Sequence, residues 1–209
     1  MSKKTPDLDT AYALETPEDS QRLYADWAET YDQTFAEESD YLLPQIVADR
    51  FASAGGQGPV LDVGAGTGLC AEALATRGVT PIDATDISQE MLDVAACKNV
   101  YRNLIQGNIL ERLPMADGRY SGIVSSGTFT NGHVGPEGFD ELLRIAAPGA
   151  LFCLSINEQH YEARGFAAKF AALGNRISDL TLPRVEIYGE NNSGAHQGDT
   201  ALIATFRKA

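Results

Sequence analysis

The architecture of the chain follows from ten residues, Val60-Leu61-Asp62-Val63-Gly64-Ala65-Gly66-Thr67-Gly68-Leu69. Leu61 and Val63 lie in an apolar run that predicts a short strand buried on both faces. The glycines that follow allow a sharp turn and a close approach of a ligand to the backbone. A helix predicted from about Thr67 directs its free N–H groups at this turn. Such a turn at the end of a parallel strand is typical of a nucleotide-binding site; the alternative is a tight turn without a ligand.

The spacing of the glycines separates two classes of nucleotide ligand. A dinucleotide fingerprint has the form G-x-G-x-x-G, but Leu69 stands at its third glycine position and Gly68 comes one residue early. The predicted strand also carries an acid, Asp62, just before the turn. The pattern L-D-V-G-A-G-T-G resembles the first motif of the class I S-adenosylmethionine-dependent methyltransferases. The resemblance implies S-adenosylmethionine as the cofactor, bound at Gly64-Ala65-Gly66, and disfavours a nicotinamide-dependent oxidoreductase.

Composition and charge limit the classes of partner. A chain of 209 residues is long enough for one α/β domain with a full core. The net charge of −13 disfavours nucleic acid and anionic membranes as partners, because both require a basic surface. The electrostatic field of a strongly negative protein suits a small neutral or cationic substrate. Solubility is an equally good explanation of the charge.

Targeting and metal-binding signals are not found in the sequence. The first seven residues lack the apolar segment of a signal peptide, and no run is long and apolar enough to span a bilayer. We therefore expect a cytoplasmic protein without membrane attachment. Cys70, Cys97 and Cys153 and the scattered histidines lack metal-ligand spacing. We expect no metal site, and reduced cysteines that pack within helices or strands.

The segment before the first strand predicts a helical cap over residues 16–56, after a loosely ordered N-terminus over residues 1–15. Thr16-Pro17 predicts the start of a helix, with Thr16 as the N-cap. Tyr24, Trp27 and Tyr31 follow at helical spacing and form one aromatic face. A second helix is predicted from about Ser39 to Ala54. Since these helices belong to no βα repeat, we expect them to pack across the sheet.

Residues 57–209 alternate strands and helices and predict a single Rossmann-like core. Strands are predicted at 60–63, 79–85, 103–107, 120–125 and 150–156, and a terminal hairpin at 177–188 and 200–207. We therefore predict an α/β, doubly wound, mostly parallel seven-stranded sheet whose last strand is antiparallel. The whole resembles the class I methyltransferase fold. Residues 24–32 and residues 127–134, which lie in the predicted loop 127–135, also resemble the Williams–Beuren region methyltransferase-like proteins.

Residues that follow the second and third strands are candidates for nucleoside contacts. Asp86 lies about twenty residues after the glycine turn, the offset of an acid that binds a ribose; the alternative is an acid that pairs with a helix dipole. Ile87 and Met91 offer apolar surface to adenine or belong to the core. In the family the position of Asn108 is often aspartate, which implies a contact of Asn108 and the Ile109 N–H with adenine; the alternative is an ordinary strand-end turn.

Three further side chains complete the predicted cofactor site. Asp62 either holds the methionine amino group, directly or through water, or accepts backbone N–H groups to brace the glycine turn. The resemblance implies that Tyr31 lies at the methionine end, and Tyr24 is its neighbour on the same face. Aromatic stripes at this spacing are otherwise more often core.

The candidate general base is His133, because it is the histidine in a strand-to-helix loop at the binding edge. The alternative is a loop histidine that is hydrogen-bonded to the backbone. His160 and His196 are expected to be peripheral. The acceptor wall is predicted from Thr128, Phe129 and Asn131 beside His133, with the other side closed by Asn157, Glu158 and Tyr161.

Together these patterns predict S-adenosylmethionine-dependent methyl transfer to a small-molecule acceptor. The reaction needs mainly alignment and desolvation, because the methyl donor is already activated. The alternative is a non-catalytic protein that binds S-adenosylmethionine or S-adenosylhomocysteine. The sequence specifies neither the acceptor nor an oligomeric state.

Overall fold

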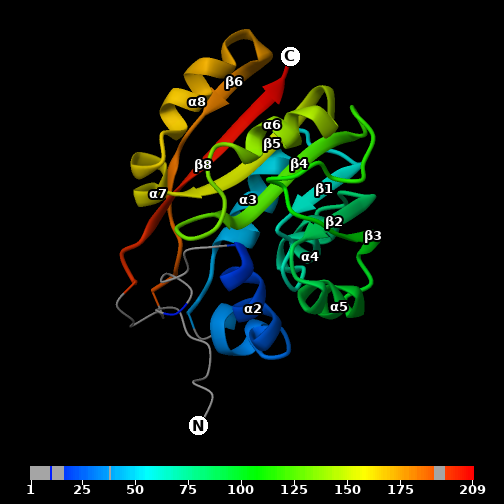
Figure 1. Cartoon of the computed structure of the whole chain (residues 1–209), viewed down its shortest axis with the longest axis vertical. Coiled ribbons are helices and arrows are strands. Elements are labelled where there is room, and N and C mark those ends of the chain that lie inside the picture. Colours follow the sequence, from blue (N-terminus) through cyan, green and yellow to red (C-terminus); the bar gives the residue numbers. More distant parts are fainter. Residues whose placement is uncertain (1–9, 11–16, 38, 191–195) are drawn as a thin grey trace.

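The structure is a computed structural model that describes residue 10 and residues 17–37, 39–190 and 196–209 (Figure 1). Loose order was predicted for residues 1–15, and an N-cap was predicted at Thr16. Apart from residue 10, these positions lie outside the described residues. Pro17 is the first residue of helix α2, as the sequence predicts.

One mixed sheet forms the centre of the described chain, in the strand order β3-β2-β1-β4-β5-β8-β6, with β7 paired to β8. β1, β2, β3, β4 and β5 pair in parallel, and β8 runs antiparallel to β5. The predicted doubly wound, mostly parallel fold is therefore confirmed. The bounds are β1 (Val60–Val63), β2 (Ile82–Asp86), β3 (Tyr101–Gln106), β4 (Tyr120–Phe129), β5 (Ala146–Asn157), β6 (Ile177–Thr181), β7 (Arg184–Glu186) and β8 (Thr200–Lys208).

The expected single strand over residues 177–188 is two strands, β6 and β7. Pro183 lies between them and has no N–H to give to the ladder. Its carbonyl still accepts a hydrogen bond from Ile203 of β8, at 2.9 Å. The described sheet therefore has eight labelled strands instead of the predicted seven.

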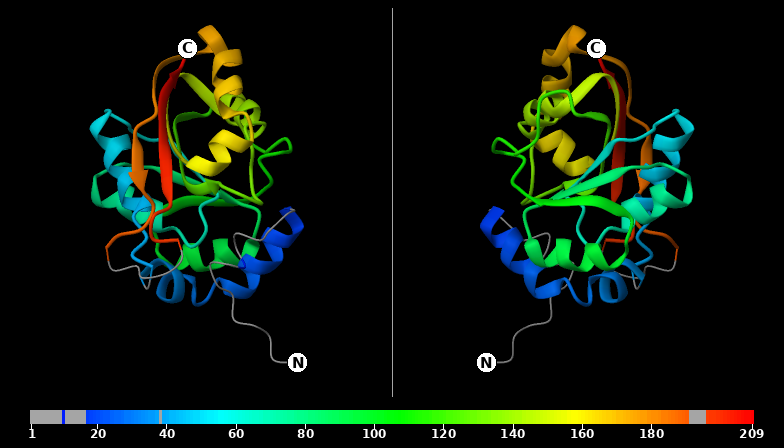
Figure 2. Two further views of the ribbon diagram at one scale, coloured as in Figure 1. Left: turned by 90° about the vertical axis from the view of Figure 1, so that its left-hand side faces the viewer. Right: turned by 90° about the vertical axis from the view of Figure 1, so that its right-hand side faces the viewer.

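Helices cover both faces of the sheet (Figure 2). Phe51 of α3 and Leu74 of α4 belong to the core on one face, while Phe139 of α6 and Phe166 of α8 belong to the core on the other. The bounds are α2 (Pro17–Trp27), η1 (a π-helix, Asp32–Glu37), α3 (Leu43–Ser53), α4 (Leu69–Thr76), α5 (Gln89–Cys97), α6 (Gly138–Ile145), α7 (Glu158–Ala163), α8 (Phe166–Leu173) and η2 (Gly174–Arg176).

Two predicted boundaries near the site are wrong. The second helix begins at Leu43 instead of Ser39, because Pro44 occupies its first turn and the chain before it forms η1. The predicted loop 127–135 begins later than expected, since β4 continues to Phe129, which pairs with Ile156. Backbone pairing with β5 extends the strand beyond the point where its apolar run ends.

The cap, which we define as α2 and η1, is held to the core at several points. In α2, the Gln21 side chain donates to the carbonyl of Ile87 at 3.2 Å, and Ser20 donates to the carbonyl of Gly132 at 3.4 Å. In η1, Asp32 pairs with Lys98 at 2.8 Å and accepts a hydrogen bond from Thr67. The cap thus bridges the end of β2 and the loop after β4.

Candidate functional site

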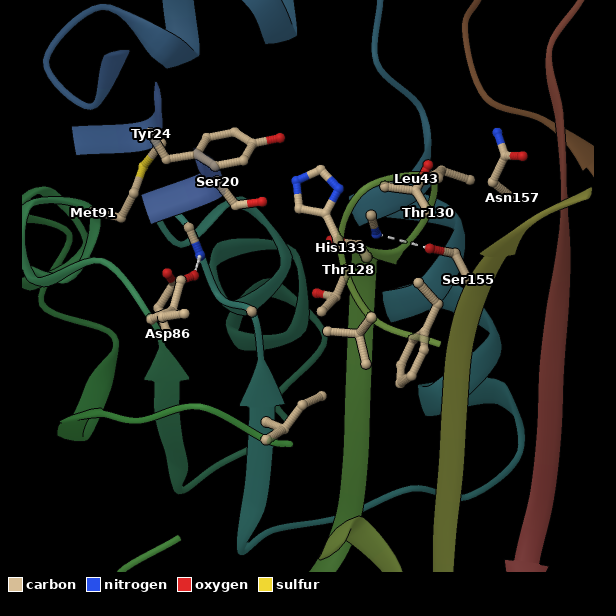
Figure 3. A pocket seen from close by; sticks show the side chains of 18 of the residues that line it. Ser20, Tyr24, Leu43, Asp86, Met91, Thr128, Thr130, His133, Ser155 and Asn157 are labelled. Carbon is tan, nitrogen blue, oxygen red and sulfur yellow. Dashed lines mark hydrogen bonds between the residues drawn. The ribbon is translucent and has the colours of Figure 1, made fainter. Parts of the chain in front are cut away.

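A cavity lies between the cap and the carboxyl ends of the parallel strands (Figure 3). Its walls come from the turn after β1, the ends of β2, β4 and β5, the segment after β3, and the cap. This is the edge at which open α/β sheets bind ligands. The predicted site residues that line it are Tyr24, Tyr31, Gly64, Gly66, Asp86, Ile87, Met91, Asn108, Ile109 and His133.

The glycine turn has backbone angles that favour glycine, with φ of +61° at Gly64 and +54° at Gly66. A Cβ at Gly64 would lie 2.0 Å from Oγ1 of Thr128, whereas a Cβ at Gly66 would meet nothing within 4 Å. Gly64 therefore allows β1 and β4 to approach each other. Gly66 leaves open space beside the backbone at the cavity wall.

Replacing Gly64 by alanine is expected to destabilise the protein more than the same change at Gly66. Gly66→Ala should cost about 1–2 kcal/mol, the strain of a left-handed alanine. Gly64→Ala should cost roughly 1 kcal/mol more, because Thr128 must move and lose its hydrogen bond to the Val63 carbonyl. Urea unfolding of both variants measures the difference. Equal losses would show that Thr128 yields without cost.

Asp86 braces the glycine turn from the end of β2. Its Oδ2 accepts the Gly66 N–H at 2.8 Å, and its Oδ1 accepts the Ser88 N–H at 2.9 Å. Burial raises the pKa of Asp86, while the backbone N–H groups lower it. Each carboxylate oxygen keeps a further lone pair, so the group can still accept hydroxyl hydrogen bonds from a ligand in the cavity.

The start of α5 gives the cavity an apolar wall next to Asp86. Ser88 is the N-cap, and its Oγ accepts the Met91 N–H at 3.2 Å. Ile87 and Met91 then line the cavity, and Figure 3 shows Met91 beside Tyr24 above Asp86. An acid next to a flat apolar wall suits a nucleoside.

Asn108 and Ile109 line the cavity after β3. Oδ1 of Asn108 accepts the Leu110 N–H at 3.0 Å, so the side chain also forms the ordinary turn that the sequence left as the alternative. Its amide NH₂ group is not used in that turn.

Two predicted residues, Asp62 and Ala65, are not among the described residues that line the cavity. One interpretation predicted that Asp62 braces the glycine turn. It does not, because its Oδ2 accepts the Tyr101 hydroxyl at 2.8 Å. Its Oδ1 is buried with no partner among the described residues, and burial raises the Asp62 pKa to about 7. Ala65 packs instead against Ala84 and Leu92.

His133 presents an uncharged nitrogen at the cavity. Its Nδ1 lies 3.0 Å from the Asn131 carbonyl, and because a carbonyl only accepts, Nδ1 carries the hydrogen. Nε2 is then an acceptor; it is buried and has no partner within the described part of the chain. Burial lowers the His133 pKa to about 4, so the ring is neutral at pH 7.

His160 was predicted to be peripheral, and this prediction is wrong. His160 instead holds the loop that carries His133. It is buried, its Nε2 donates to the Val134 carbonyl at 2.9 Å, and its Nδ1 contacts the side-chain amide of Asn131 at 3.2 Å. No sequence signal pointed to this contact, since α7, which carries His160, and the loop meet only in the fold.

The acceptor wall was predicted in part. Thr128, Phe129, Asn131 and Asn157 line the cavity, but Glu158 and Tyr161 are not among its described lining residues. Glu158 pairs instead with Arg184 and accepts from Thr200. The lining residues that the sequence reasoning did not single out include Phe35, Tyr41, Leu43, Ser155, Ile187 and Tyr188.

The predictions about cysteine packing and metal binding concern residues outside the cavity. Cys70 and Cys153 are buried, but Cys97 is exposed and is therefore not the packing residue that was expected. Within the described ranges, no group of three or more His, Cys, Asp or Glu side chains is placed to hold a metal ion. No helix in the same ranges has the length and apolar character needed to cross a membrane.

Comparisons with known proteins bear on the same region. A family model described as a methyltransferase domain matches residues 60–149. Human methyltransferase-like protein 27 is 32% identical over 159 residues, which is 70% of this chain and 64% of that protein. The chain thus spans less than two thirds of the length of this curated relative.

Solved structures share the fold at low identity. A TehB-like S-adenosylmethionine-dependent methyltransferase from Corynebacterium glutamicum has a TM-score of 0.62 and 18% identity, covering 89% of this chain and 98% of that one. A structure reported for the conversion of a disulfide bond into a thioacetal group in echinomycin biosynthesis has a TM-score of 0.61 and 18% identity, covering 82% and 84%.

Proposed function

Because this chain belongs to the class I S-adenosylmethionine-dependent methyltransferases, we propose that it transfers a methyl group from S-adenosylmethionine to a small-molecule acceptor. One observation carries the proposal. One cavity is lined by the glycine turn, Asp86 and His133, whose Nε2 has no partner among the described residues.

The proposed cofactor residues fit a nucleoside with an attached amino acid. Asp86 would accept both ribose hydroxyls, Ile87 and Met91 would face adenine, and Asn108 and the Ile109 N–H would contact its edge. The Gly64-Ala65-Gly66 turn gives the backbone close access, Ala65 acting through its place in the turn. The bound cofactor supplies an activated methyl group on a sulfonium.

The methionine end is assigned to the cap side of the turn. Tyr24 and Tyr31 face the cavity, and burial keeps their hydroxyls protonated by raising each pKa. Asp62 would reach the amino group through a water, since its Oδ1 is unpartnered but does not line the cavity. His133 would accept the proton of the acceptor at Nε2.

The test measures binding and turnover separately. Calorimetry should show one site per chain for S-adenosylmethionine and for S-adenosylhomocysteine. A metabolite screen read by mass spectrometry should then show methylation that depends on the cofactor. Binding without turnover on any metabolite would favour the alternative, a non-catalytic cofactor-binding protein, and absence of binding would contradict both.

The cap is proposed to act as a lid. Because it bridges the end of β2 and the loop after β4, a ligand between them should hold it closed. Hydrogen exchange in residues 17–37 should slow on addition of S-adenosylhomocysteine, by up to about 100-fold at 100 times the Kd if opening requires ligand release. Helix α8 is the internal control and should not change. Equal protection of the cap with and without ligand would contradict the proposal.

The remaining expectations also belong to this proposal. The domain is taken as residues 16–209, with an N-terminal helical part over 16–56, which contains the cap and α3, and a core over 57–209. The protein is placed in the cytoplasm and without nucleic acid as a partner. Limited proteolysis, cell fractionation and a test for nucleic acid in the purified protein would examine these points.

A further inference from the structure

The cavity carries a wall of aromatic side chains. We define the aromatic wall as Tyr24, Trp27, Tyr31, Phe35, Tyr41 and Tyr188, which all line the cavity. Ring centroids of successive members lie 6.3, 5.2, 4.8, 5.1 and 6.0 Å apart. The wall begins in the cap and ends where Tyr41 forms an isolated β-bridge with Tyr188.

The wall extends past the proposed cofactor end. In Figure 3, Asp86, Met91 and Tyr24 lie on one side of His133, and Leu43, Ser155 and Asn157 lie on the other. Tyr188 and Ile187 follow β7, which pairs with β8 next to β5, on the Ser155 side of the sheet. The wall therefore serves the acceptor end as well as the cofactor end.

The acceptor end has no side chain to neutralise an ion. Among the described lining residues, Asp86 is the only one that is charged at pH 7, and it lies at the cofactor end. Burial raises the pKa of Tyr41, as it does for Tyr24 and Tyr31, so these hydroxyls stay neutral. A buried carboxylate or phosphate would lack a counter-ion here. An alkylammonium has no free lone pair at pH 7, so it cannot act as a nucleophile until it loses a proton.

We propose, on the basis of the proposed function, that the acceptor is an uncharged arylamine, a planar ring that carries its nucleophilic nitrogen. A planar ring can stack on the aromatic wall, whose rings present faces and edges. The centroid distances between these rings are the ones usual for aromatic pairs. The reacting nitrogen gains positive charge, and aromatic faces attract a cation. A phenol would have to react as an anion, which the same faces repel and no cationic side chain holds.

The proposed step balances with the residues present. The nitrogen lone pair forms the N–CH₃ bond as the S–CH₃ bond breaks, and the sulfur keeps that electron pair. The positive charge passes from sulfur to nitrogen. In the same step the N–H proton moves to Nε2 of His133, which acts as a general base and leaves a neutral N-methylarylamine. The imidazolium later loses this proton to water. His133 is a weak base because its pKa is lowered to about 4. It can still take the proton, because an arylamine is a weak base as well.

Four one-ring probes test the inference on the full chain saturated with S-adenosylhomocysteine. Aniline and phenol are uncharged at pH 7.5, benzylamine is a cation and benzoate an anion, and their sizes are similar. Binding is measured by saturation-transfer NMR with titration. Aniline should bind about tenfold or more tightly than benzoate, as expected if an anion goes uncompensated. Benzylamine, whose lone pair carries a proton, should not be methylated. With S-adenosylmethionine, N-methylaniline should form about 100-fold faster than methyl phenyl ether.

The outcomes separate this inference from the proposed function. If the cofactor itself does not bind, the proposed function fails. If the cofactor binds but benzoate binds more tightly than aniline, if phenol or benzylamine is the better acceptor, or if no N-methylaniline forms, the arylamine inference is overturned and the cofactor assignment stands.

Variants of the aromatic wall give an independent readout. Tyr188→Leu should weaken aniline binding about two- to tenfold, as expected for the loss of one aromatic pair. Tyr188→Phe keeps the ring and should bind aniline as the parent does. Tyr41→Leu is the second variant, in case Tyr188→Leu fails to fold. Affinity for aniline that is unchanged in a folded leucine variant would remove that ring from the acceptor site.

Discussion

His133→Ala is expected to lower turnover by about 10²–10⁴-fold, the usual contribution of general-base catalysis. The reason is the lone pair on Nε2, which has no partner among the described residues and belongs to a side chain that lines the cavity. The hydrogen bond between Nδ1 and the Asn131 carbonyl fixes the tautomer. Cofactor affinity should barely change, because Asp86 and the glycine turn lie at the other end. Single-turnover kinetics and calorimetry measure the two effects separately.

His196→Ala is the matched control, because His196 contacts Asp199 and is not among the described lining residues of the cavity. It should keep full turnover. Loss of cofactor binding in His133→Ala would make His133 structural, and full activity would mean that alignment alone carries the reaction.

The pH profile gives a second reading of the same residue. A base must be unprotonated, and burial lowers the His133 pKa to about 4. Activity that depends on His133 should therefore stay constant as the pH falls from 8 to about 5 and decrease only near pH 4. A decrease centred near pH 6.5, the ordinary value, would show that His133 is solvated when the enzyme works.

Asp86→Ala is expected to weaken binding of S-adenosylmethionine by about 2–4 kcal/mol, because two charge-assisted hydrogen bonds are lost and water restores part of their energy. The structure adds a second cause. The carboxylate also accepts the Gly66 and Ser88 N–H groups, so its removal loosens the turn that approaches the ligand. Calorimetry with both cofactor forms measures the loss.

Two variants separate the direct and indirect parts of this effect. Asp86→Asn keeps one acceptor oxygen for the turn but removes the charge, so it should lose less affinity than Asp86→Ala. Asp93→Ala removes an exposed acid from α5, the helix that follows Asp86, where Asp93 contacts Gln89, and this variant should bind normally. Unchanged affinity in Asp86→Ala would exclude Asp86 from the site.

The order of strands and helices could be predicted from the sequence because its signals are local. Apolar runs mark the parallel strands, the Gly64-Ala65-Gly66 turn requires left-handed glycines, and Ser88 caps its helix through an atom three residues away. Asp86 was identified by its offset from the turn, which the βα unit sets. These features depend on residues close together in the chain, so spacing alone reveals them.

The roles of individual side chains depended on contacts between distant segments. Asp62 and Asp86 are both acids at strand ends, but only the fold turns Asp86 toward the Gly66 N–H and places Tyr101 against Asp62. His160 reaches the His133 loop because β5 lies beside β4, and the aromatic wall closes because Tyr188, far along the chain, pairs with Tyr41. No local pattern encodes such pairings, since burial and hydrogen-bond satisfaction are set by whichever segments the sheet brings together.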